Sequence, residues 1–102
     1  MAVCFPYGVE FGIQAAKDAV REMFYPQHDG DFETVSGVDR TYIMSPYSSR
    51  SIAEVGPVDA AGSAWTCVEI SQFGPYRSKA EIRAFDCTVT RIAKERGNHL
   101  SA

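Results

Sequence analysis

The chain has 102 residues and a formal net charge of −3, with 45% of its residues apolar and 23% charged. A chain of this length and apolar content forms one domain around one core, which we place at residues 1–102, and intrinsic disorder is excluded. Residues 1–70 carry four bases and ten acids, whereas residues 71–102 carry six bases and three acids. This division excludes both a uniformly basic nucleic-acid binder and a strongly acidic mimic of nucleic acid.

The length of the apolar runs and the number and spacing of the cysteines indicate the cellular compartment of the protein. No apolar run approaches the roughly 18 residues that cross a bilayer, so we expect no membrane partner. The first eight residues lack a basic region and are interrupted by Pro6, so as they stand they do not form a signal peptide. The three cysteines are odd in number and have no CxxC spacing, which is typical of a reducing compartment. We predict a cytoplasmic protein, or an exported one if residues that precede Met1 are missing.

Residues 9–25 show the strongest periodicity in the chain. Apolar residues recur every three or four positions from Val9 to Phe24, and polar residues occupy the other face. This spacing predicts an amphipathic helix that packs on a core with one side in water. Pro26 ends the helix, because the residue before a proline avoids helical dihedral angles.

Short extended segments follow this helix. β-branched and aromatic residues predict strands over about 31–35 and 38–44, joined by a tight turn at Ser36-Gly37. Residues 45–63 are irregular apart from a short strand at 52–55. A long irregular connection in a small domain often carries function, so we expect an interaction loop here.

The last part of the chain predicts a hairpin. Residues 64–70 and 80–93 form two extended runs around a loop that contains Gly74-Pro75. Symmetry about Arg77 gathers apolar side chains on one face, with Cys67 opposite Cys87, Trp65 opposite Val89 and Glu69 opposite Phe85. A competing interpretation makes Ser78-Lys79-Ala80-Glu81 a capping box that opens a short helix through Phe85. Residues 94–102 are expected to form a polar, frayed tail.

The cysteines have two interpretations. Cys67 and Cys87 fit small apolar residues buried on the core face of the hairpin. A cross-strand disulfide between them is the alternative, and it would indicate an exported protein. No two of the cysteines and histidines, Cys4, His28, Cys67, Cys87 and His99, have the short spacing of structural zinc ligands, so we predict no metal site.

Candidate catalytic groups are present without a catalytic spacing. His28 stands beside Asp29 and Asp31 in a sequence typical of a solvated turn. The serines at 48–51 lack a neighbouring base, and the chain has no nucleophile elbow and no phosphate-binding loop. Glu69, at the end of its predicted strand, needs either a partner such as Arg83 or solvent at the sheet rim. We predict no catalytic residue and no cofactor, and an enzyme is the less favoured class.

Basic and aromatic residues form the candidate binding surface. Arg77, Lys79 and Arg83 share one face of the predicted strand 80–93 and its approach, where they form either an ordinary charged surface or a site for an acidic protein. Nucleic acid is the least favoured partner. Because aromatic and arginine side chains dominate protein interfaces, we expect a partner to contact Tyr47, Arg50, Phe73, Tyr76, Arg77, Lys79 and Arg83.

Short motifs extend over about residues 15–90. They are the helical run from Ala16 to Arg21 with Pro26, then Phe32 and Val35, then the run from Cys67 to Ile70, the turn from Phe73 to Tyr76, and Phe85. This series resembles a small uncharacterised domain of bacterial and phage proteins, although Pro75 stands where that domain has a second glycine. The resemblance implies a helix packed on an antiparallel sheet, and it implies no activity.

These features together predict an α+β fold, with one N-terminal amphipathic helix packed on a four- or five-stranded antiparallel sheet. We expect a small non-enzymatic protein-binding module, such as an inhibitor or adaptor from a phage or mobile element, of the anti-CRISPR type. One alternative is a ligand-binding or enzymatic roll, with a pocket between helix and sheet that uses His28, Cys67 or Glu69. Another is a structural homodimer formed through an exposed strand.

Overall fold

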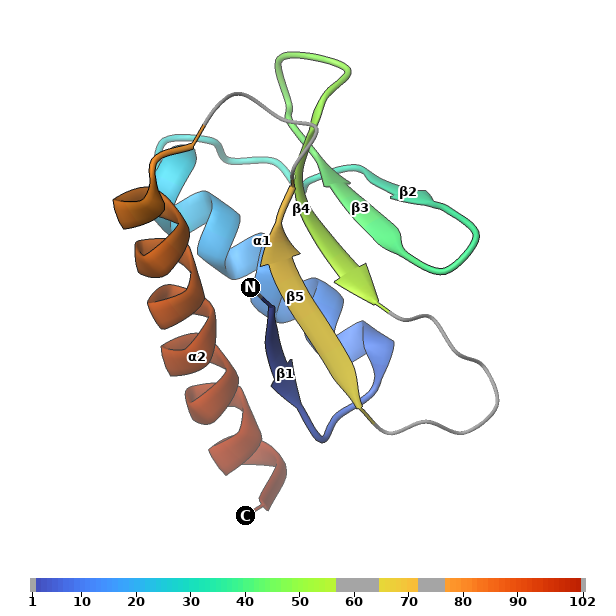
Figure 1. Cartoon of the computed structure of the whole chain (residues 1–102), viewed down its shortest axis with the longest axis vertical. Coiled ribbons are helices and arrows are strands. Elements are labelled where there is room, and N and C mark those ends of the chain that lie inside the picture. Colours follow the sequence, from blue (N-terminus) through green and yellow to red (C-terminus); the bar gives the residue numbers. More distant parts are fainter. Residues whose placement is uncertain (1, 57–64, 72–76, 102) are drawn as a thin grey trace.

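The computed structural model describes residues 2–56, 65–71 and 77–101 and has an α+β fold (Figure 1). A five-stranded antiparallel sheet has the strand order β1-β5-β4-β3-β2, so β1 and β2 are its outer strands. Two helices complete the fold, where the sequence predicted one. In chain order the elements are β1 (Val3–Phe5), α1 (Val9–Phe24), β2 (Thr34–Ser36), β3 (Thr41–Met44), β4 (Ser51–Gly56), β5 (Thr66–Ile70) and α2 (Lys79–Ser101).

Helix α1 confirms the amphipathic helix expected over residues 9–25, and it passes behind the sheet in Figure 1. Its buried face is made of small residues, Gly12, Ala15, Ala16 and Ala19, with Val20. Small side chains let the helix axis approach the strands closely. A Cβ added at Gly12 would lie 2.3 Å from Cγ2 of Thr66 and 2.9 Å from Cγ1 of Val55, so glycine is required at this contact.

Strand alternation assigns the two faces of the sheet. Thr66 and Val68 of β5 are buried on the face that α1 covers, whereas Cys67 and Glu69 point to the opposite face. Glu54 of β4 pairs with Glu69 in the register, so it shares that opposite face. Cys67 and Glu69 therefore do not line a pocket between α1 and the sheet, as the enzymatic alternative requires.

The C-terminal segment is helix α2, and the strand predicted over residues 80–93 is wrong. The capping box is present: the Glu81 amide donates to Ser78 Oγ at 3.1 Å, and the Ser78 amide donates to Glu81 Oε1 at 3.2 Å. Apolar residues three or four apart then face the core, namely Ile82, Phe85, Val89, Ile92 and Ala93. The cross-strand pairs expected around Arg77 do not form, and the tail expected from residue 94 continues this helix to Ser101.

Ion pairs and aromatic packing join the two helices. Arg96 donates through Nε to Asp18 Oδ2 at 3.0 Å, and Arg91 pairs with Glu22. The rings of Phe24 and Phe85 stack with centroids 6.2 Å apart. Acidic residues from the first part of the chain therefore pair with basic residues from its last part within one molecule.

The remaining strands differ from the prediction mainly at their ends. The strands expected at 31–35, 38–44 and 52–55 are β2, β3 and β4, and the one expected at 64–70 is β5, whose residue 64 lies outside the described residues. Strand β1 has no recognisable sequence pattern, because three residues are too few to show an alternation. Of the irregular connection at 45–63, residues 51–56 form β4 and residues 57–63 lie outside the described part.

We predict that Gly12→Ala destabilises the fold. The new methyl group would overlap Thr66 and Val55, which costs about 1–3 kcal/mol and outweighs the roughly 1 kcal/mol that alanine gains in a helix. Urea unfolding followed by circular dichroism measures the change. Gly8→Ser is the control, because nothing lies within 4 Å of a Cβ at Gly8 and serine is a good cap. A second change, Thr66→Ser, removes the nearest methyl group and should restore part of the loss.

Candidate functional site

A groove of about 320 Å³ lies between the outer strand β1 and the C-terminal half of α2. The segment from β1 to the start of α1 forms one wall, and α2 forms the other. The lining residues are Val3, Cys4, Phe5, Pro6, Tyr7, Thr90, Ala93, Lys94, Gly97 and Asn98.

The helical wall follows from residue spacing on α2. Ala93 and Gly97, four residues apart, are buried; the small side chain of Ala93 leaves room beside it, whereas Tyr7 lies where a side chain at position 97 would point. Thr90, Lys94 and Asn98 repeat at the same interval and are exposed along the rim. A Cβ at Gly97 would lie 2.8 Å from the Tyr7 hydroxyl oxygen, so glycine allows the helix to approach the segment that follows β1. The groove is thus bounded by a close contact between α2 and the segment that follows β1.

The strand wall offers backbone groups. The Ser71 amide donates to the Ile52 carbonyl at 2.8 Å, so these two residues form a hydrogen-bonded pair of the β4–β5 ladder. Hydrogen-bonded and non-hydrogen-bonded pairs alternate along an antiparallel ladder. Thr66 and Val68 therefore direct their backbone N–H and C=O groups away from β4 and toward β1. Their partners there are Phe5 and Val3, so the N–H and C=O of Cys4 point away from the sheet. Pro6 follows with no N–H and limits the length of this free edge.

A disulfide joins Cys4 to Cys67 across β1 and β5, two residues that are 63 positions apart. Their Cα atoms are 4.0 Å apart, which is consistent with the non-hydrogen-bonded pair deduced above. Both predictions for the cysteines are therefore wrong: Cys67 is bridged to Cys4, and Cys87 is a free, exposed thiol on α2. The bond was missed because β1 was not recognised as a strand.

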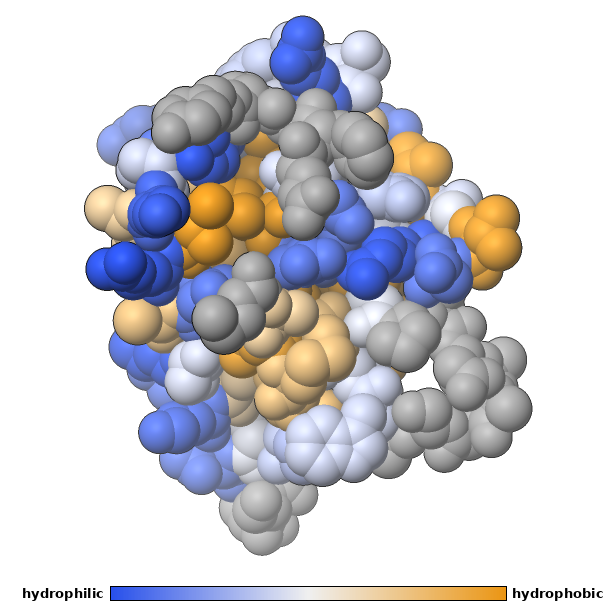
Figure 2. Space-filling model, viewed as in Figure 1, coloured by the Kyte–Doolittle hydropathy of each residue, from blue (hydrophilic) through white to orange (hydrophobic). Residues whose placement is uncertain are grey.

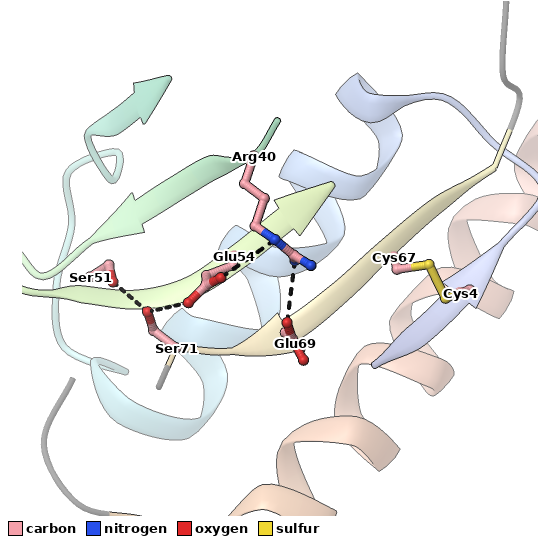
Figure 3. Close-up of polar contacts among 7 residues, drawn as sticks. All are labelled: Cys4, Arg40, Ser51, Glu54, Cys67, Glu69 and Ser71. Atoms are coloured by element: carbon pink, nitrogen blue, oxygen red, sulfur yellow. Dashed lines mark hydrogen bonds and ion pairs between the residues drawn. A yellow bond between two sulfur atoms is a disulfide. The ribbon is translucent and has the colours of Figure 1, made fainter. Parts of the chain in front are cut away.

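A polar network crosses the sheet face opposite α1 (Figure 3). Arg40 lies between two glutamates, 3.2 Å from Glu69 and 3.8 Å from the buried carboxylate of Glu54. Ser71 donates to Glu54 at 3.0 Å and is itself bonded to Ser51. Glu69 thus pairs with Arg40 and not with Arg83. Figure 2 shows hydrophilic residues across this face, next to a more apolar area over β1 and β5.

Asp86, on α2, has a carboxylate oxygen whose hydrogen-bonding capacity is not satisfied among the described residues. Its Oδ1 is buried and has no hydrogen-bond partner among the described residues. Burial raises the pKa of the Asp86 carboxyl, and the negative charge of Glu69 adds to this. Since the folded state holds this proton more tightly, the contribution of Asp86 to stability falls as the pH rises above the ordinary pKa of an aspartate.

Aromatic side chains gather where α1 ends, around the predicted contact residue Tyr47. The rings of Tyr25 and His28 lie 5.7 and 6.0 Å from that of Tyr47. The Arg21 guanidinium lies 4.9 Å from the centre of the Phe32 ring and donates to the carbonyl of Gly30 at 2.6 Å. The His28 turn is therefore tied to α1, and Tyr47 remains 76% exposed.

The predicted contact residues lie in two separate places. Tyr47 and Arg50 occupy the turn between β3 and β4, while Lys79 and Arg83 are exposed near the start of α2. Arg77 lies over the Phe24 ring at 4.2 Å and pairs with Glu81 at 3.5 Å, so it serves packing. Phe73 and Tyr76 lie outside the described residues. Sequence reasoning missed the groove residues, although the interval of Thr90, Lys94 and Asn98 would have indicated a helical stripe.

The chain matches no protein-family model, no curated protein and no solved structure in the comparisons made. Within residues 2–56, 65–71 and 77–101, no helix is long and apolar enough to cross a membrane. The same residues contain no cluster of three or more potential metal ligands.

We predict that losing the disulfide costs about 4 kcal/mol of the free energy of unfolding, the value expected when a bridge closes a loop of this length. Cys4→Ser with Cys67→Ser removes the bond, and denaturant unfolding measures the loss. Cys87→Ser is the matched control and should leave stability unchanged. Peptide mapping by mass spectrometry without reductant should find Cys4 linked to Cys67; three free thiols would contradict the bridge.

We predict that Arg40→Met lowers the free energy of unfolding by about 2 kcal/mol, because Glu54 is left buried without its cation. Adding Glu54→Gln removes the buried charge and should recover part of this loss. Arg50→Met is the control, since Arg50 is exposed and forms no ion pair among the described residues. Equal losses for Arg40→Met and Arg50→Met in chemical denaturation would contradict the role of the network.

Proposed function

We propose that this protein is a small non-enzymatic binding module that holds an extended segment of a partner protein in the groove between β1 and α2. The observation that carries the proposal is the free backbone edge at Cys4, which faces a helix across a groove of about 320 Å³. An extended chain placed there would add a strand to the sheet. Main-chain hydrogen bonds would supply affinity, and alternate side chains would supply selectivity.

The lining supports a short ligand. Pro6 ends the edge on one side, and the contact between Tyr7 and Gly97 narrows the groove. The buried Ala93 offers a floor for one apolar side chain of the ligand, while Thr90 and Asn98 offer polar groups at the rim. This combination of an apolar floor and a few polar groups is typical of a recognition site.

The polar side chains elsewhere favour a binding module over an enzyme. Arg40, Glu54 and Glu69 engage one another, and Asp18 and Glu22 hold α2. The buried, hydrogen-bonded position of Glu54 supports a structural role for that carboxylate. We assign no reaction to these groups.

The disulfide indicates the redox compartment in which the protein functions. A structural bond between Cys4 and Cys67 persists in an oxidising environment, and thiols of the cytosol oppose it. We therefore propose an oxidising compartment in place of the cytoplasm predicted from the cysteine count. Origin in a phage or mobile element and an anti-CRISPR role remain predictions from the sequence.

The test is selection of random linear peptides from a displayed library by the oxidised, full-length protein. We expect enriched peptides to slow amide exchange in residues 2–7. Thr90→Trp fills the groove rim and should reduce binding of an enriched peptide about ten-fold or more, as a blocked hot-spot contact does. Ala84→Trp is the control, because Ala84 is exposed on the same helix and does not line the groove.

Two results would overturn the proposal. One is a selection that enriches no peptide. The other is an enriched peptide whose binding is equally sensitive to Thr90→Trp and Ala84→Trp and whose protection lies outside residues 2–7. Protection at residues 34–36, or a dimer in sedimentation, would instead support pairing through the exposed strand β2.

A further inference from the structure

Lys94 is the one charged side chain among the ten residues that line the β1–α2 groove. It is exposed, and within the described part of the chain it takes part in no ion pair. A free ammonium group at the rim of a concave surface makes the local potential positive. This charge is available to a ligand.

The other bases of α2 are engaged or distant. Arg91 and Arg96 pair with Glu22 and Asp18 of α1 on another side of the helix. Lys79 and Arg83 precede Lys94 by at least eleven residues, which is about 16 Å along a helix. Lys94 therefore acts alone on the groove, and its effect can be isolated by substitution.

Hydrogen-bonding side chains stand one turn on each side of Lys94. Asn98 is exposed on one side, and its amide can donate to an anion. Thr90 on the other side already donates its hydroxyl to the Asp86 carbonyl at 2.8 Å, so it contributes an acceptor only. The donors Lys94 and Asn98 together match a carboxylate, which accepts through two oxygens.

The end of the helix does not cancel this preference. The partial negative charge of a helix C-terminus acts within the last turn, whereas Lys94 lies seven residues, or about 10 Å, before Ser101. The nearest unpaired acid of the helix, Asp86, lies about 12 Å along the axis in the other direction. A full positive charge at Lys94 thus dominates the middle of the groove wall.

We propose that the segment bound between β1 and α2 carries a carboxylate that pairs with Lys94 and Asn98. This inference rests on the proposed function and specifies its ligand as an acidic extended peptide. The carboxylate comes from an aspartate or glutamate side chain or from the free C-terminus of the ligand. Both sources present the same chemistry to the groove.

The experiment repeats the displayed-peptide selection with the wild type, Lys94→Glu and Lys79→Glu. The two variants change net charge equally, and Lys79 is exposed on the same helix but outside the groove. We expect the wild type and Lys79→Glu to enrich peptides with an acid at one fixed position. Lys94→Glu should lose that preference and enrich a base there. Unchanged thermal unfolding establishes that each variant is folded.

Synthetic peptides then measure the contribution of the charge. Replacing the selected acid by its amide should weaken binding to the wild type about five-fold, the upper range for a solvent-accessible ion pair, and should have little effect on Lys94→Gln. The difference should shrink in high salt. A ligand that requires its C-terminal carboxylate loses binding on C-terminal amidation, whereas one that uses a side chain does not.

The failures are distinguishable. Peptides that bind the groove, as shown by protection of residues 2–7, but carry no preferred acid and bind Lys94→Glu equally well would overturn the acidic ligand and leave the proposed function standing. A selection that enriches no peptide with any of the three proteins would overturn both.

Discussion

The covalent link between Cys4 and Cys67 determines where the first strand lies, and the groove exists only while that strand is in place. Strand β1 has three residues, and among the described strands it pairs with β5 alone. A strand so short gains little from its own hydrogen bonds, since each contributes about 1 kcal/mol net. The bridge removes much of the chain entropy that would otherwise favour detachment. Phe5 and Tyr7 then pack against Phe11 of α1, so one bond also fixes the entry to the first helix.

Charge is distributed in the fold in a way that net charge does not reveal. The acids of α1 meet the bases of α2 across the helix pair, and Arg40 meets two glutamates across the sheet. Exposed pairs of this kind contribute little each, whereas the buried Glu54 depends on its partners because an unpaired buried charge is costly. The cationic groups in these pairs therefore stabilise the fold and are already neutralised by a carboxylate. Lys94 differs because it is exposed, lines a concave surface and takes part in no ion pair within the described part of the chain.

Sequence patterns predicted the elements that have a period long enough to be read. Helix α1 repeats its apolar residues over four turns, and β5 alternates over five residues, so both were found. The segment from Ala80 to Ala93 was misread because its apolar residues also satisfy an alternation over short windows, and the capping box at Ser78 and Glu81 was the more specific local signal. The groove could not be predicted, because it depends on a tertiary contact between residues near the two ends of the chain.

Along α2, the core selects large apolar side chains, whereas the contact beside the groove selects glycine. Core packing selects Phe85, Val89 and Ile92, which fill the space against α1 and the sheet. Helix propensity alone would favour alanine at position 97, since glycine in the interior of a helix costs about 1 kcal/mol relative to alanine. The Tyr7 hydroxyl oxygen would lie 2.8 Å from a Cβ at that position, which explains why glycine is accommodated there. Glycine at this position therefore sets how closely α2 approaches the segment that follows β1, and both residues of this contact line the groove.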